Sequence, residues 1–318
     1  MTRLAIATGD PAGVGPEVSV RALAALPASA SAVLFGDGVD LRRRLAAAGI
    51  SARVEVVDVG ACPPEVVAAH RDDAASGRVA LAALDGAIDA VRSKRADAIV
   101  TAPVSKGAIT LAGHRFVGQT EHLARRAGLG DDDVTMMFLG PRLRVALVTT
   151  HLAVRALSAE ITRPRIRRTI RHLAEALIAL GAPRGARLVV CGLNPHAGEH
   201  GLFGDEEDVT ISPVVQALAR EDPFADGTLA LEGPRPAEAA FRDAQAGRVF
   251  GVVAMFHDQA TIASKLLDWG SAVNVSWGLP FPRTSVDHGV AYDAARSGCA
   301  EADGMIAAVE LAVRLVRR

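Results

Sequence analysis

Three histidines stand where apolar runs of the sequence end. His151 follows an aliphatic run over 145–149, His196 lies in an Asn-Pro-His-Ala-Gly stretch after a run over 188–192, and His257 follows a run over 249–255. They are too far apart in the chain for a local metal motif, so tertiary or quaternary structure would have to assemble any metal site. Three imidazoles with one open position form a Lewis-acid centre. The pattern is also compatible with three separate structural histidines.

A second set of polar residues has a chemistry suited to anions. Lys265, Asn274 and Arg283 recur at nine-residue intervals and are flanked by apolar residues. A guanidinium, an ammonium and an amide together suit a phosphate or a carboxylate. The alternative is ordinary solvated surface charge.

Several other residues could support these sets. Asn194 and Asp258, next to the histidines, could orient an imidazole ring by hydrogen bonding. The glycine-rich segment 9–17 matches neither a Walker loop nor a dinucleotide fingerprint, so it is read as a tight turn or as a ligand contact. Asp10 within it is either a functional carboxylate or the first residue of an Asx turn. Lys106 follows a buried-looking strand and could face a ligand or cap a helix.

The elements that must position these residues alternate along the chain. Short aliphatic runs are separated by longer alanine-rich stretches with helical spacing, the pattern of an α/β fold. Strands are predicted at 4–8, 32–36, 54–59, 98–102, 145–149, 188–192, 249–255 and 273–277, and helices at 16–26, 39–48, 75–91, 120–127, 162–180 and 301–316. In such folds, ligands bind beyond the carboxyl ends of the strands.

Composition excludes several classes of protein. The 318 residues carry 35 Lys and Arg against 36 Asp and Glu, a net charge of -1, which argues against nucleic acid as a partner. No apolar run is long enough for a membrane span and no signal peptide is visible, so a cytoplasmic location is expected. Three dispersed cysteines argue against a disulfide framework or a thiolate zinc site.

Five sequence blocks together resemble the 4-hydroxythreonine-4-phosphate dehydrogenase family of vitamin B6 biosynthesis. They occur in family order and reach from residue 9 to about residue 295. The blocks are 9–17 (GDPAGVGPE), 101–103 (TAP), 192–199 (GLNPHAGE), 256–259 (FHDQ) and 278–289 (GLPFPRTSVDHG).

The resemblance implies two α/β lobes of the isocitrate/isopropylmalate dehydrogenase type with a cleft between them. It also implies a homodimer with its active site near the subunit interface, NAD as oxidant, and one divalent metal per subunit (Zn, Mg, Mn or Co). By motif match, the metal ligands are His151, His196 and His257. Residues 1–117 and 285–318 are expected to form the first lobe, and residues 118–284 a second lobe carrying the metal and substrate residues. By motif match, the substrate contacts are Lys265, Asn274 and Arg283, and the implied cofactor loop is Asp287, His288 and Gly289. Gln119 and Thr120 are expected to help to bind the anionic end of the substrate.

One position departs from the family pattern. The family usually reads Gly-His-Thr-Glu where this chain has Gly118-Gln119-Thr120-Glu121, and Gln119 can donate a hydrogen bond but cannot carry a proton. A second departure follows Gln259: residues 260–264 read Ala-Thr-Ile-Ala-Ser, where the family tends to have Gly followed by an aliphatic-Pro pattern. Both departures lie beside the expected pocket. Both favour a paralogue acting on a related four-carbon sugar acid phosphate.

The predicted activity is therefore NAD- and metal-dependent oxidation of the secondary alcohol of a phosphorylated hydroxy acid, such as 4-phosphooxy-threonine or a 4-phospho-threonate or erythronate, followed by decarboxylation of the keto product. The base that accepts the hydroxyl proton stays open among Asp258, Lys106 and a metal-bound water. The alternatives are a dihydrodiol dehydrogenase of the same family, a phosphate acyltransferase-like enzyme and a binding protein without turnover.

Overall fold

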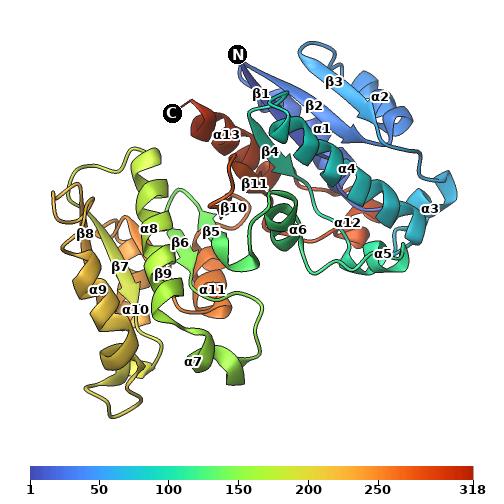
Figure 1. The fold of residues 1–318 in the computed structure, drawn as a ribbon. Coiled ribbons are helices and arrows are strands. Elements are labelled where there is room, and N and C mark those ends of the chain that lie inside the picture. Colours follow the sequence, from blue (N-terminus) through green and yellow to red (C-terminus); the bar gives the residue numbers. More distant parts are fainter. Residues whose placement is uncertain (318) are drawn as a thin grey trace. The chain divides into compact units, whose positions relative to one another are not determined.

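The chain forms two compact units, each built around a mostly parallel sheet. The computed structural model describes residues 1–317, and of Asp131 only the backbone. Unit 1 comprises Met1–Val134 and Val273–Arg318, and unit 2 comprises Thr135–Ala272. The chain thus leaves unit 1 once and returns to it, and Figure 1 shows the order of the elements by colour.

Unit 1 contains six strands in the order β3-β2-β1-β4-β11-β10. Five of them run parallel and β10 runs antiparallel to β11. The strands are β1 (Thr2–Ala7), β2 (Ala30–Gly36), β3 (Val54–Asp58), β4 (Ala98–Thr101), β10 (Val273–Trp277) and β11 (Arg283–Ser285). The helices are α1 (Gly15–Ala22), α2 (Gly38–Ala47), α3 (Pro64–Ala69), α4 (Ala74–Arg92), α5 (Lys106–Leu111), α6 (Gln119–Arg126), α12 (Tyr292–Ser297) and α13 (Asp303–Val316).

The core of unit 1 follows from the two-residue period of its strands. Ala5, Ala7 and Val33 pack in one buried cluster with Leu84 and Ile88 of α4. Because successive strand residues face opposite sides of the sheet, the alternate residues are left for a second helical layer. The helix α13 packs against β11, β4 and β1.

Unit 2 contains five strands in the order β5-β6-β9-β7-β8, with β5 antiparallel to β6 and the others parallel. The strands are β5 (Thr135–Leu139), β6 (Arg144–Leu147), β7 (Ala186–Cys191), β8 (Leu229–Arg235) and β9 (Gly251–Ala254). The α-helices are α7 (Leu157–Glu160), α8 (Arg163–Ala179), α9 (Ser212–Leu218), α10 (Ala237–Gln245) and α11 (His257–Leu267).

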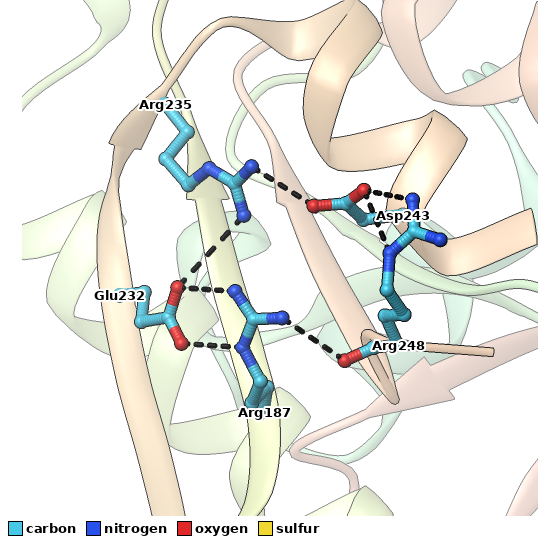
Figure 2. Close-up of polar contacts among 5 residues, drawn as sticks. All are labelled: Arg187, Glu232, Arg235, Asp243 and Arg248. Atoms are coloured by element: carbon cyan, nitrogen blue, oxygen red, sulfur yellow. Dashed lines mark hydrogen bonds and ion pairs between the residues drawn. The ribbon is translucent and has the colours of Figure 1, made fainter. Parts of the chain in front are cut away.

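A network of ion pairs connects β7, β8 and α10 in unit 2. Arg187 of β7 holds Glu232 of β8 through two hydrogen bonds, and Arg235 and Arg248 both bind Asp243 of α10 (Figure 2). Arg235 also lies 3.8 Å from Glu232, so the charges form one chain from β7 to α10. The guanidinium groups of Arg248 and Arg235 lower the pKa of Asp243 to about 2.

The predicted elements are present, and the structure adds others. Every predicted strand and helix has a counterpart within a few residues. The strands β5, β8 and β11 were not predicted. Two residues of β8, Gly233 and Pro234, are strand breakers in sequence terms, and β11 has only three residues. Seven of the α-helices that the structure describes were not predicted either: α3, α5, α7, α9, α10, α11 and α12.

The unit boundaries differ from those expected from the sequence. They fall after Val134 and before Val273, where residues 117/118 and 284/285 were expected. Helix α6 belongs to unit 1 because His122 and Arg126 bind Asp85 of α4, and β10 belongs there because it pairs with β11. The predicted substrate residues Gln119, Thr120, Asn274 and Arg283 therefore lie in unit 1, whereas the predicted metal residues lie in unit 2.

None of the helices within residues 1–317 combines the length and the apolar character that a membrane span requires.

Candidate functional site

A buried arginine forms the centre of the anion-binding candidate in unit 1. Arg283 begins β11 and is 3% exposed. Its neighbour Thr284 faces the other side of the sheet, where its hydroxyl donates to the carbonyl of Ala308 in α13. The strand period therefore places Arg283 on the face that α13 does not cover.

The hydrogen-bond acceptors of this guanidinium are uncharged. Its Nη1 donates to Oδ1 of Asn274 (3.2 Å) and to Oγ of Ser276 (3.0 Å), and its Nη2 donates to Oγ1 of Thr101 (2.8 Å) and to Oε1 of Gln119 (3.0 Å). Its buried Nε has no hydrogen-bond partner within the part of the chain that the structure describes. Each of the four acceptors of this cation is thus an uncharged oxygen.

Such a cation is costly to bury without an anion. Burial lowers the pKa of Arg283 to about 10, against a rise caused by the charge of Glu121. The group still carries its charge at neutral pH. Because an uncompensated buried charge costs several kcal/mol, a site of this kind is stabilised when an anionic ligand enters. The geometry therefore favours a phosphate or carboxylate ligand at Arg283.

Gln119 and Thr120 begin α6 and hold positions around this arginine. The Nε2 of Gln119 donates to the carbonyl of Ala102 (3.0 Å) while its Oε1 accepts from Arg283. The Thr120 hydroxyl lies 3.2 Å from Oγ of Ser276. The predicted residues Gln119, Thr120, Asn274 and Arg283 are therefore brought together.

Two members of this set were missed in the sequence. Ser276 stands two residues after Asn274 on β10, so the strand period places both on one face of the sheet. Thr101 ends β4 and is the register neighbour of Ser285 on β11. The two-residue spacing could have identified Ser276, but Thr101 joins the set only through strand pairing.

Lys265 does not belong to this set of unit 1. It lies on α11 in unit 2, exposed, with its Nζ 5.7 Å from the ring centroid of Trp269. The nine-residue interval that linked it to Asn274 and Arg283 spans the boundary of the two units. Its predicted role in substrate binding stays a prediction.

Two of the three predicted metal ligands lie side by side in unit 2. The ring centroids of His151 and His257 are 5.5 Å apart, with an angle of 45° between the rings. The Nδ1 of His257 lies 2.7 Å from Oδ1 of Asp258, which fixes the orientation of this ring and leaves its Nε2 for another partner. The predicted orienting role of Asp258 is thus present in the geometry.

One local and one long-range hydrogen bond of Gln259 fix the turn that carries His257. Its neighbour Gln259 accepts a hydrogen bond from the backbone N–H of Met255 (2.7 Å) and donates to the carbonyl of Gly192 (3.0 Å). These bonds tie the turn between β9 and α11 to the end of β7. The helix therefore begins at the histidine.

The third histidine has different surroundings. His196 lines a cavity of about 560 Å³ together with His200, Glu207 and Asp208. Both His196 and Ala197 have left-handed backbone torsions (φ 52° and 53°), which non-glycine residues rarely adopt. The amide of Asn194 donates to Glu206 and Glu207, so the structure gives it carboxylate partners in place of the expected imidazole.

The donor chemistry fits a divalent metal in part. Two imidazoles, one of them oriented by a carboxylate, suit two positions of a zinc-type site. Within residues 1–317 no group of three or more His, Cys, Asp or Glu side chains is arranged to hold a metal ion. The assignment of His196 as third ligand stays a prediction.

The predicted cofactor loop lies beside the glycine-rich turn of unit 1. His288 and Gly289 are exposed after β11, and the loop continues to Val290, whose carbonyl accepts from the N–H of Val14 (3.0 Å). Gly13 allows this approach because a Cβ there would lie 2.6 Å from that carbonyl. The turn contains the Asx arrangement considered for Asp10, whose Oδ1 accepts from the N–H of Ala12 (2.9 Å).

Comparison with known proteins connects these features to one family. The family model described as pyridoxal phosphate biosynthetic protein PdxA matches residues 21–312. A 4-hydroxythreonine-4-phosphate dehydrogenase of Chromobacterium violaceum is 41% identical over 329 residues, covering 98% of this chain and 96% of the relative.

Solved structures agree with this similarity. The chain resembles 4-hydroxythreonine-4-phosphate dehydrogenase from Klebsiella pneumoniae with a TM-score of 0.79 and 33% identity, over 100% of this chain and 98% of that one. A terephthalate 1,2-cis-dihydrodiol dehydrogenase from Burkholderia xenovorans LB400 has a TM-score of 0.68 and 30% identity, over 98% of each chain. The chain also resembles isocitrate dehydrogenase from Methylococcus capsulatus, with a TM-score of 0.54 and 14% identity over 100% of this chain and 88% of that one. This likeness confirms the predicted fold type alone.

Proposed function

The chain belongs to the PdxA family of pyridoxal phosphate biosynthesis, and from this premise we propose that it oxidises the secondary alcohol of a phosphorylated hydroxy acid with NAD as the hydride acceptor. The proposed substrates are 4-phosphooxy-threonine and the related 4-phospho-threonate and 4-phospho-erythronate. Oxidation transfers the carbinol hydride to NAD and releases the hydroxyl proton. A keto product with a carboxylate in the β position can then lose carbon dioxide.

The observation that carries this proposal is the buried Arg283 with its neutral partners. A phosphate or carboxylate at this position would supply the missing counter-charge. Asn274, Ser276 and Thr101 hold the guanidinium in place, so its fork is oriented before the ligand arrives. Such orientation reduces the entropy that the bound substrate must lose.

The histidines of unit 2 have a separate role in the proposal. His151 and His257 would hold the divalent cation, with His196 as the third proposed ligand, and the cation would supply Lewis acidity at the reacting hydroxyl. Asp258 keeps His257 in the tautomer that presents Nε2. Zinc, magnesium, manganese and cobalt remain the proposed metals.

A substrate panel tests the activity. The purified protein, supplied in turn with each divalent metal, is mixed with NAD and 4-phosphorylated threonine, threonate or erythronate, and NADH is followed by absorbance. We expect turnover of at least one phosphorylated acid and much slower turnover of its dephosphorylated form. Oxidation of an aromatic cis-dihydrodiol at a greater rate would instead favour the second candidate, to which the Burkholderia xenovorans relative points.

A metal-retention measurement tests the histidine assignment. His196→Ala is expected to lose bound metal and turnover while its circular dichroism spectrum stays that of the wild type. His200→Ala is the matched control, because His200 lines the same cavity but is not a proposed ligand. Full metal content and activity in His196→Ala would remove His196 from the site.

The homodimer and the cytoplasmic location remain part of the proposal. Exposed apolar residues on α11 and in the turn that follows it, on the helix that begins at the proposed metal ligand His257, support a subunit interface there. They are Ile262, Leu266 and Trp269, which are 61%, 79% and 70% exposed.

A further inference from the structure

Four side chains that the proposed reaction does not use form a hydrogen-bonded cluster in unit 1. They are Asp10 after β1, Asp72 before α4, Ser105 before α5 and Tyr292 at the start of α12. The Tyr292 hydroxyl lies 3.0 Å from Oδ2 of Asp10 and 2.8 Å from Oδ1 of Asp72. One phenol thus lies within hydrogen-bond distance of two carboxyl groups.

The hydrogens available to these contacts can be counted. Tyr292 has a single hydroxyl hydrogen and can donate to only one carboxyl. Ser105 Oγ accepts from the N–H of Ala108 (3.1 Å) and gives its own hydrogen to Oδ1 of Asp72 (2.5 Å). If both carboxyls were ionised, one contact of Tyr292 would join two acceptors without a hydrogen. One of the two carboxyls must therefore carry the missing proton.

Burial decides which carboxyl carries it. Asp10 is 0% exposed and has no hydrogen bond to a cationic side chain within residues 1–317, whereas Asp72 is exposed to solvent. Burial raises the pKa of Asp10; the N–H of Ala12 and the hydroxyls of Tyr292 and Ser76 oppose this rise, and the charge of Asp72 adds to it. Burial also raises the pKa of Tyr292, so the phenol keeps its hydrogen. The proton is therefore placed on Oδ2 of Asp10.

The cluster holds the end of the proposed cofactor loop. Tyr292 directly follows Ala291, whose φ of 48° is in the left-handed region that alanine rarely adopts. On the N-terminal side of Ala291, Val290 is bonded to Val14 of the glycine-rich turn. The Tyr292 side chain also connects the end of this loop to the glycine-rich turn, because its partner Asp10 belongs to that turn.

We propose that Asp10 is a neutral carboxylic acid that donates a hydrogen bond to Tyr292, which in turn donates one to Asp72. These two consecutive hydrogen bonds position the loop 287–291 for the dinucleotide. The first half concerns Asp10, Tyr292 and Asp72 alone. The second half rests on the proposed function, because it assigns the loop to NAD. Asp10 and Tyr292 are accordingly positioning residues.

The proposal makes Asp10→Asn a test with a defined outcome. In a neutral Asp10, Oδ1 accepts from Ala12 and Oδ2 donates to Tyr292. An asparagine offers the same one acceptor and one donor in the same shape. Asp10→Asn should therefore preserve both hydrogen bonds of residue 10. Asp10→Ala removes both of them, and Tyr292→Phe removes the hydroxyl that accepts from Asp10 and donates to Asp72.

Infrared difference spectroscopy of the full-length protein at neutral pH measures the proton without any cofactor. The wild-type minus Asp10→Asn spectrum should contain the carbonyl band of a protonated carboxylic acid. That band should shift to higher frequency in Tyr292→Phe, because the acid then loses its acceptor. A difference spectrum without such a band would overturn the assignment.

Steady-state kinetics tests the loop. Tyr292→Phe and Asp10→Ala should raise the KM for NAD about tenfold, the effect of losing one or two hydrogen bonds, with kcat and the KM of the phosphorylated acid within about twofold of wild type. Asp10→Asn should keep the wild-type KM for NAD. An Asp10→Asn variant as impaired as Asp10→Ala would show that the negative charge is needed and would refute the neutral acid.

The two proposals fail separately. A wild-type protein with no NAD-dependent turnover on any hydroxy acid would remove the proposed function and the NAD half of this inference, while the infrared band would still decide the proton on Asp10. An active enzyme whose KM for NAD is unchanged in Tyr292→Phe would remove only the loop assignment.

Discussion

Arg283 shows how one buried residue can indicate a ligand class. Its four acceptors, on β4, β10 and α6, are neutral, so the protein supplies geometry to the guanidinium but no directly bonded counter-charge. A lysine at this position would carry the same charge on one nitrogen. It could not reproduce the planar fork that contacts four oxygens.

We therefore expect Arg283→Lys to raise the KM for the phosphorylated acid by about 10- to 100-fold, the range of one lost hydrogen bond to a charged group. Steady-state kinetics with the phosphorylated and dephosphorylated acids checks this result. The dephosphorylated acid is the control, since the two enzymes should treat it alike. An equal loss on both acids would place the role of Arg283 elsewhere.

Gln119 is the second informative residue. Both ends of its amide are occupied, one by Ala102 and the other by Arg283, so it acts on the guanidinium directly. In Gln119→His, an imidazole with one donor and one acceptor would have to take both contacts with a different reach. We expect relative kcat/KM to shift toward 4-phosphooxy-threonine by about tenfold. An unchanged ranking of the three acids would remove Gln119 as the determinant of specificity.

At the scale of elements, the chain Arg187–Glu232–Arg235–Asp243–Arg248 connects two strands and a helix of unit 2 (Figure 2). Asp243 accepts from two arginines. Its folded pKa of about 2 lies below the ordinary value of 3.8, so ionised Asp243 stabilises the fold above pH 4. This contribution disappears as the pH falls from about 4 to about 2.

Asp243→Asn should therefore lower Tm at pH 7 by a few degrees, because the arginines lose their shared anion. The difference in Tm between wild type and variant should shrink as the pH approaches 2. Calorimetry at several pH values measures both effects. A difference that is the same at pH 7 and pH 2.5 would show that charge at Asp243 does not stabilise unit 2.

At the scale of the whole molecule, large apolar side chains on and just after helix α11 are exposed to solvent in the part of the chain that the structure describes. Ile262 and Leu266 follow the i, i+4 spacing on α11, and Trp269 lies in the turn just after the helix; all three are exposed. Large apolar patches of this kind mark interaction surfaces. The same helix begins with His257, so dimerisation there would place the proposed metal site near the interface.

We expect Leu266→Glu to convert the proposed homodimer into a monomer at micromolar concentration, because a carboxylate would be buried without a partner. Size-exclusion chromatography with light scattering gives the mass. Val39→Glu, at another exposed apolar position on α2, serves as the control and should leave the mass unchanged. A dimeric Leu266→Glu protein would exclude this helix face as the interface.

The sequence by itself determined the fold class, the predicted strands and helices, and most residues of both candidate sites. Period and composition are local properties, so they are visible without coordinates. The order of strands, the inclusion of α6 in unit 1 and the position of Thr101 beside Arg283 depended on contacts between segments that are distant in the sequence. The same holds for Asp10 and Tyr292: the burial of a carboxyl and the number of hydrogens shared with its neighbours are properties of packing, and only the tertiary structure brings residues 10, 72, 105 and 292 together.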